Sequence, residues 1–271
     1  MHDVQNHSDE RGIPIDRVGV CGLKYPIIVL NRDGQRQPTI ATISMSVDLS
    51  HRFKGTHMSR FIEVLNRYHG EIAMRTFPLI LDELKSRLQA KKAHIEMKFP
   101  YFLQRSAPVS GAKAMIDYEC RFSAECNASR DDFFLSVSAP VTTLCPCSKA
   151  ISDYGAHNQR GEITIDVMIE TGGRTVWIEE IIEIAEASAS SPVYGLLKRA
   201  DERHVTMQAY DNPTFVEDIV RNVTVRLKGD ERIMWFKVHA INHESIHNHN
   251  AFAEIHWQRQ QLATLARKGD V

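Results

Sequence analysis

The order of strand-like and helix-like segments is the feature that most constrains the fold of this sequence. Two strand-like runs are followed by two amphipathic segments and two more strand-like runs, and the same order starts again near residue 131. The predicted strands span residues 18–30, 39–49, 94–103, 113–126, 133–141, 162–170, 233–241 and 251–257, and the predicted helices span residues 59–69, 77–92, 177–187 and 214–227. Adjacent pairs of strands favour antiparallel sheets with helices on one face, so we expect an α+β fold.

The doubled order also predicts the organisation of the chain. We expect one unit over residues 18–126 and a second over residues 131–258, with flexible termini at residues 1–17 and 259–271. The strand at 162–170 has the clearest pattern, because Ile163, Ile165 and Val167 alternate with polar or less apolar residues. Such alternation is typical of a sheet with one buried face.

Composition excludes several classes of protein. The 271 residues are 43% hydrophobic and 25% charged, which excludes disorder and fibrous repeats, and 33 Lys and Arg against 34 Asp and Glu argue against a nucleic-acid binder. No apolar run approaches the roughly 18 residues that span a bilayer. The polar N-terminus lacks the apolar segment of a secretory signal. Five cysteines favour reduced thiols. We therefore expect a cytoplasmic protein without nucleic-acid or membrane partners.

Five of the 13 histidines fall between residues 239 and 256. Residues 243–247 fit the His-Glu-x-x-His pattern of zinc proteases, in which both histidines lie on one helix. Here the segment lies between two predicted strands without an amphipathic helix, so we expect a loop whose side chains could converge on a ligand. The alternative is a solvated polar loop.

Cys145 and Cys147 flank a proline, and His157 follows ten residues later. Thiolate and imidazole are good ligands for zinc or iron, but Cys-x-Cys is not the spacing of a closed structural zinc site. The alternative interpretation is two small buried cysteines and a loop histidine. The zinc deaminase pattern fits only in part, because His94 and Glu96 match its first half but Ala150 stands where the second cysteine is required.

Two further groups carry charge. Residues 54–60 bring a glycine, hydroxyls and cations to a predicted helix N-terminus, where backbone N–H groups favour an anion such as phosphate, or where Ser59 simply caps the helix. Residues 201–204 and 217–218 are acidic runs on polar segments between helices, and most such acids are solvated surface groups.

Taken together, several of these segments resemble the type IB GTP cyclohydrolases. The resemblance runs from residue 18 to residue 257 and does not include the termini. The motifs that carry it are residues 54–61, 144–149, 155–160, 192–194, 212–218 and 243–249.

The resemblance implies a tunnelling fold, with two strand-strand-helix-helix-strand-strand units in one chain and a barrel closed by oligomerisation. It also implies a homotetramer with active sites at subunit interfaces. The implied reaction converts GTP and water to 7,8-dihydroneopterin triphosphate and formate, the first step of folate-type pterin biosynthesis. A divalent metal, Mn²⁺, Fe²⁺ or Zn²⁺, is implied as cofactor, and it would activate the water that attacks C8 of guanine.

The resemblance also assigns roles by motif. Cys145 is the first expected metal ligand, His157 the second, and Glu202 completes the set. Glu244 and His247 are expected to transfer protons beside the metal, and either could also touch it.

Substrate contacts are implied in the same way. Glu217 is expected to anchor guanine through N1–H and the exocyclic amine. Lys54, His57 and Arg60 are the expected contacts of the triphosphate. Cys147 is expected to be structural.

Overall fold

Antiparallel strands are the main regular structure of the described residues, ahead of helices. The computed structural model describes residue 5 and residues 7–68, 76–126, 131–169 and 174–259. Its strands are β1 (Ile15–Leu30), β2 (Arg36–Leu49), β3 (Ala93–Ser106), β4 (Lys113–Cys126), β5 (Asp131–Leu144), β6 (Asn158–Ile169), β7 (Ser191–Pro192), β8 (Ile233–Asn242) and β9 (Ala251–Gln258). Its helices are α1 (Met58–Tyr68), α2 (Phe77–Leu88), α3 (Pro146–Ile151), α4 (Ile178–Glu186), α5 (Arg199–Asp211) and α6 (Val216–Lys228).

The strands form one continuous sheet in the order β1-β2-β3-β4-β5-β6-β8-β9, with β7 paired to β5. The two halves of the chain meet where β4 and β5 pair in antiparallel register from Glu119 opposite Ser138 to Cys126 opposite Asp131. Within the described residues, β1 and β9 are the outer strands, and each pairs on one side. The sheet is therefore open at both edges.

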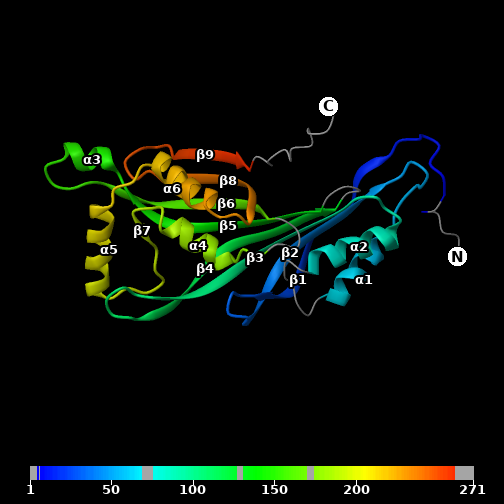
Figure 1. Cartoon of the computed structure of the whole chain (residues 1–271), viewed down its shortest axis with the longest axis horizontal. Helices are drawn as coiled ribbons and strands as arrows, with labels where there is room; N and C mark the ends of the chain where they lie inside the picture. The colour runs from blue at the N-terminus through cyan, green and yellow to red at the C-terminus, as the bar shows by residue number, and fades with distance from the viewer. Residues whose placement is uncertain (1–4, 6, 69–75, 127–130, 170–173, 260–271) are drawn as a thin grey trace, which may run out of the picture.

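Helices pack on one face of this sheet, as the strand pairs predict. In β6, Ile163, Ile165 and Val167 are fully buried, which confirms the predicted alternation. Helix α2 packs on β3 and β4, α4 on β5 and β6, and α6 on β8 and β9 (Figure 1). The opposite face carries charged pairs, including Arg121–Asp166 at 2.9 Å. The helix-covered face is thus the hydrophobic core.

The two halves are not identical. Residues 15–126 have the predicted order of two strands, two helices and two strands, whereas the second half adds α3, β7 and α5. The prediction that residues 201–204 lie between helices is wrong, because they belong to α5. Only Asp201 and Ala209 of this helix are buried, so the sequence carries no apolar stripe that could reveal it.

Two helix boundaries also differ from the prediction. Helix α1 begins at Met58, so Ser59 lies inside its first turn and is not the N-cap. Helix α2 ends at Leu88, because Gln89 adopts a left-handed conformation with φ 53° and its N–H bonds to the last turn. No helix among the described residues is long and apolar enough to cross a bilayer.

The N-terminal segment contacts the chain just before α1. The backbone N–H of Lys54 donates to the carbonyl of His7 at 2.9 Å, and the N–H of Gly55 donates to the carbonyl of Gln5 at 3.1 Å. Residues 260–271, predicted to be flexible, lie outside the described residues.

Candidate active site

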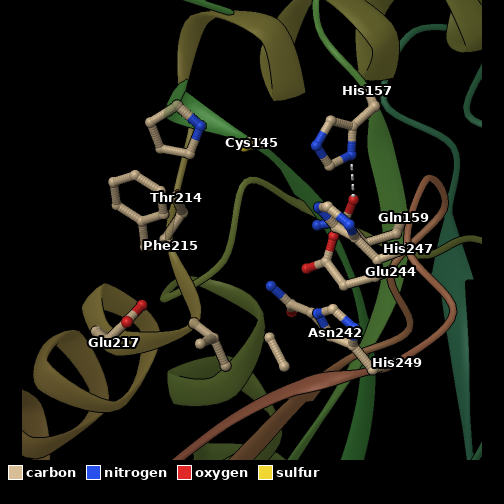
Figure 2. Close-up of a pocket in the computed structure, with 13 residues that line it drawn as sticks. Cys145, His157, Gln159, Thr214, Phe215, Glu217, Asn242, Glu244, His247 and His249 are labelled. Atoms are coloured by element: carbon tan, nitrogen blue, oxygen red, sulfur yellow. Dashed lines mark hydrogen bonds between the residues drawn. The ribbon is translucent and has the colours of Figure 1, made fainter. Parts of the chain in front are cut away.

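A pocket of about 280 Å³ lies where the ends of β5 and β6 meet the start of α6 and the loop between β8 and β9 (Figure 2). Its chemically reactive or hydrogen-bonding lining residues are Cys145, His157, Gln159, Thr214, Glu217, Asn242, Glu244, His247 and His249. The fold thus gathers five of the nine predicted site residues from four separate segments of the chain.

Cys145 follows the last residue of β5 and caps α3. Its backbone is extended, Pro146 is the first residue of the helix, and the N–H of Ser148 donates to the Cys145 sulfur at 3.5 Å. Pro146 supplies the fixed φ that a helix start needs, and α3 is a short helix of six residues. Cys145 is half-buried and Cys147 is exposed, so the alternative of two buried cysteines is wrong.

His157 is held by a neighbouring amide. Gln159 Nε2 donates to Thr143 Oγ1 at 2.9 Å, which leaves Gln159 Oε1 facing His157 Nδ1 at 2.9 Å. An oxygen there requires that Nδ1 carry the proton, so Nε2 keeps its lone pair. Ser245 Oγ also lies 3.3 Å from Nδ1. Sequence reasoning assigned no role to Gln159, because a neutral amide carries no catalytic signature.

The start of α6 forms the opposite wall. The N–H of Thr214 donates to the carbonyl of Leu144 at 3.0 Å, which ties this helix to the strand that precedes Cys145. Asp218 accepts from the N–H of Phe215 at 3.4 Å and so caps the helix. Glu217 is thereby left for another role: its carboxylate has no hydrogen-bond or ion-pair partner in the described part of the chain. Phe215, 38% exposed, presents an aromatic ring beside it (Figure 2).

Residues 243–250 connect β8 to β9 without a helix, as predicted. The N–H of His243 donates to the carbonyl of Arg160 at 2.9 Å, which fixes the start of the loop against β6. Glu244 and His247 line the pocket, and the His247 ring stacks on that of His249 with centroids 5.1 Å apart. The zinc-protease helix is excluded.

Asn242, the last residue of β8, is a pocket residue that sequence reasoning missed. It is 3% exposed, and its Oδ1 is buried without a hydrogen-bond partner among the described residues. Such an atom costs about 1–3 kcal/mol. The signal was present in the alternation of β8, which puts residue 242 on the same buried face as Val238 and Ala240. An amide side chain at a position on the buried face of a strand is unusual unless a polar group binds it.

Glu202 is not brought to this pocket. It lies exposed on α5, whereas its neighbour Asp201 is fully buried. Burial favours a raised pKa for Asp201, but the hydroxyl and N–H of Ser110 and the N–H groups of Lys198 and Val109 outweigh it and hold that pKa well below its usual range. Asp201 therefore fastens α5 to the turn between β3 and β4.

The predicted triphosphate contacts lie in a different part of the molecule. Lys54 and His57 precede α1, and Arg60 lies in its first turn. Arg60 donates to the carbonyl of Arg87 at 2.8 Å. Helix α1 is at the opposite end of the long axis from α3, next to which Cys145 lies (Figure 1). One chain therefore does not bring the two groups together.

The donor chemistry of the pocket suits a divalent metal. A thiol from Cys145, an imidazole nitrogen from His157 and a carboxylate from Glu244 face one cavity, and these are the ligand types that zinc and iron accept. The described residues contain no group of three such side chains close enough to hold an ion by themselves. The pocket therefore provides donors without a complete ligand shell.

Comparison with known proteins identifies the family. A family model described as type I GTP cyclohydrolase FolE2 matches residues 1–253. The GTP cyclohydrolase FolE2 of Syntrophus aciditrophicus is 53% identical over 255 residues, which cover 94% of this chain and 99% of that protein. The chain belongs to the type I GTP cyclohydrolase FolE2 family. The FolE2 protein of Citrifermentans bemidjiense is also 53% identical, over 260 residues and 96% of each chain.

Solved structures confirm the tunnelling fold of this FolE2 family member. The uricase of Arthrobacter globiformis superimposes with a TM-score of 0.54 over 94% of this chain and 96% of its own, at 7% sequence identity. A uricase from Bacillus fastidious gives the same TM-score, 0.54, over 89% of this chain and 93% of its own, at 8% identity. At such low identity the likeness concerns the fold alone.

Proposed function

We propose that this chain is a GTP cyclohydrolase that converts GTP and water to 7,8-dihydroneopterin triphosphate and formate, the first step of folate-type pterin biosynthesis. The observation that carries the proposal is the juxtaposition in one pocket of Cys145 and His157 with the carboxylate of Glu217, which has no partner among the described residues. The family supplies the substrate class, and the pocket offers groups suited to each end of a guanine base.

Glu217 and Phe215 suit recognition of the base. A carboxylate can accept from N1–H and the exocyclic amine of guanine together, and the Phe215 ring beside it offers a flat surface for stacking. With the pyrimidine ring at this wall, the five-membered ring of guanine extends toward Cys145 and His157. The atom that must be attacked, C8, belongs to that ring.

Cys145 and His157 would hold a divalent metal, with Glu244 or His247 of the same pocket as further donors. The metal, when bound, supplies the Lewis acidity that activates water for attack on C8. Because Gln159 keeps the proton on Nδ1, His157 offers Nε2 to the pocket. We propose Mn²⁺, Fe²⁺ or Zn²⁺, since all three accept sulfur, nitrogen and oxygen ligands.

Glu244 and His247 suit proton transfer. After attack at C8, the imidazole ring opens, formate leaves, the ribose rearranges and a new ring closes, and each step moves protons between nitrogen and oxygen atoms. A carboxylate and an imidazole on one loop, half-buried and exposed respectively, could reach both the bound base and bulk water.

We further propose a homotetramer in the cytoplasm, with active sites at subunit interfaces. The open edges β1 and β9 in the described sheet support side-by-side assembly, which would cover them. The Lys54 region and the Cys145 pocket lie far apart in one chain (Figure 1), so they could act on one substrate only if they came from different chains. This supports a site shared between chains. The five cysteines, which all lie in the described residues, form no disulfide, which supports a reducing compartment.

The decisive experiment is a formate assay on purified protein after chelation and reconstitution with single metals. Formate release from GTP, with a fluorescent pterin after oxidation, is expected with at least one of Mn²⁺, Fe²⁺ and Zn²⁺, and loss of release is expected on chelation. Folded protein that releases no formate with any of the three would refute the proposal.

A further inference from the structure

Asn242 is a buried polar side chain whose amide the fold does not use. Its Oδ1 is buried without a partner, and its Nδ2 has no acceptor among the described residues, although the residue is only 3% exposed. Buried amides in folded proteins are normally satisfied, and an unsatisfied one indicates a role outside stability. Oδ1 lies against Gly161, so Nδ2 is the atom of this amide that a ligand in the pocket can contact (Figure 2).

The backbone opposite Asn242 is shaped to admit its side chain. Gly161 pairs with Asn242 across β6 and β8, and a Cβ atom at residue 161 would lie only 2.9 Å from Asn242 Oδ1 and 3.1 Å from the carbonyl oxygen of Ile241. Glycine therefore leaves room for the amide oxygen at the inner side. As Figure 2 shows, the amide nitrogen points into the pocket, toward the side on which Phe215 and Glu217 lie.

The position of this nitrogen matters for a base bound at Glu217, an inference that rests on the proposed function. The edge of guanine that carries N1–H and the 2-amino group also carries O6, next to N1. If Glu217 accepts from the two donors, O6 still needs a donor. Glu217, Glu244 and Gln159 Oε1 face the pocket as acceptors. The rings of His247 and His249 also line it, but they stack on each other on an exposed loop. Asn242 Nδ2 is a neutral amide donor on a buried residue, with no competing partner in the described chain.

We propose that Asn242 donates a hydrogen bond from Nδ2 to O6 of the guanine and so selects a 6-oxopurine. A 6-aminopurine such as adenine would turn its own N–H toward that donor, leaving two donors face to face. Specificity of this kind arises because the buried amide is left unpaired with the wrong base. Asn242 is therefore a specificity residue that touches the substrate and takes no part in the bond changes.

Binding of three nucleotides can distinguish the contact of Asn242 with O6 from the contact of Glu217 with the 2-amino group. GTP has the complete edge, 6-thio-GTP replaces O6 by a poor acceptor but keeps both donors, and ITP keeps O6 but lacks the 2-amino group. Equilibrium binding of each to the full-length protein is measured with EDTA present, so that turnover does not interfere. The variants are Asn242→Ala, the isosteric Asn242→Asp, Glu217→Gln, and, as a control, Asn250→Ala at the far end of the loop that follows Asn242 and outside the pocket.

Wild-type protein should bind GTP about 10-fold more tightly than 6-thio-GTP, as expected for one hydrogen bond. Asn242→Ala should lose about 10-fold in GTP affinity and no longer distinguish the two, while still preferring GTP to ITP. Asn242→Asp should bind GTP more weakly still, because its carboxylate repels O6. Glu217→Gln should lose the preference for GTP over ITP but still prefer GTP to 6-thio-GTP. Asn250→Ala should match wild type.

Thermal unfolding separates this role from a structural one. Asn212 donates to the carbonyl of Ala189 at 2.9 Å, so Asn212→Ala should lower Tm, whereas Asn242→Ala should leave Tm unchanged or raise it. The proposal is overturned if Asn242→Ala keeps the wild-type preference for GTP over 6-thio-GTP, or loses the preference over ITP instead. Because the readout is binding, a protein with the expected pattern but no formate release would refute the cyclohydrolase function and leave this inference standing.

Discussion

At the scale of single residues, chemically identical side chains have different environments. Cys145 and Cys147 are two positions apart, yet the first lines the pocket and the second is exposed outside it. The difference comes from the short α3, which turns successive side chains in different directions. The same applies to Glu217 and Asp218, of which one caps α6 and the other faces the pocket.

Substitution of these cysteines tests the assignment. Cys145→Ala should reduce formate release from GTP at least about 100-fold, because loss of a ligand should cost no less than loss of a group that supports one. It should change Tm little, because the one hydrogen bond found at the Cys145 sulfur in the described residues is long, 3.5 Å. Cys147→Ala is the matched control and should keep wild-type activity. Equal activity of the two variants in a formate assay would contradict the ligand role.

Gln159 should act through His157. Gln159→Leu removes the oxygen that holds the proton on Nδ1, so kcat is expected to fall about 10- to 100-fold, as is metal affinity. Gln159→Glu restores an acceptor at that position and should recover part of the loss. The measurements are kcat and metal affinity for both variants. Equal impairment of Gln159→Leu and Gln159→Glu would contradict the role of an acceptor at His157 Nδ1.

At the scale of elements, buried polar groups can hold a helix that apolar packing does not. Helix α5 has almost no buried apolar side chain, and it is anchored by Asp201, which accepts hydrogen bonds from the β3–β4 turn and from its own N-terminus. Because those bonds hold the pKa of Asp201 below its usual range, the carboxylate stabilises the fold at neutral pH.

Asp201→Asn should therefore lower Tm at pH 7. A carboxyl whose pKa is depressed in the folded state contributes its full stability above the unfolded pKa of about 3.9 and loses it as the pH falls through the folded value. The Tm difference between wild type and Asp201→Asn should accordingly shrink as the pH falls below about 4. Glu202→Gln, on the exposed side of the same helix, should not change Tm. A Tm difference independent of pH would contradict this origin.

At the scale of the whole molecule, the pocket and the segment expected to bind the triphosphate lie at opposite ends of one chain. The pocket lies beside α3 and α6, and the cation-bearing segment before α1 lies at the far end of the long axis (Figure 1). A triphosphate is far too short to span that axis. If both groups act on one GTP, they must come from different chains of an oligomer, which closed symmetry allows.

Subunit mixing tests this arrangement. Cys145→Ala and Lys54→Ala should each be inactive alone, one through the pocket and the other through the triphosphate contact. Mixed by co-expression or by reversible dissociation, they should regain about a quarter of wild-type activity, since random assembly places a wild-type pocket against a wild-type cation segment at one site in four. No recovery in mixtures shown to contain both variants would place the two groups outside a common site.

Much of this protein could be predicted from its sequence. The elements β6, α2, α4 and α6 are each buried on one side. One-sided burial gives a regular spacing of apolar residues, and that spacing can be recognised in the sequence. The acidic helix α5 could not be predicted, because its stability comes from hydrogen bonds to a turn about 90 residues away in the sequence. Cys145, His157 and Glu217 were found by motif.

What the sequence alone determined is the order of elements, the buried face of each strand and the identity of reactive side chains, because these depend on local spacing and residue chemistry. Only the tertiary structure decided which side chains share a pocket. Glu202 stays on the surface of α5, Gln159 fixes the proton of His157, and Asn242 turns an unpartnered amide toward the place where a base would bind. Such groupings depend on register between strands and on the approach of distant segments, and no local pattern encodes either.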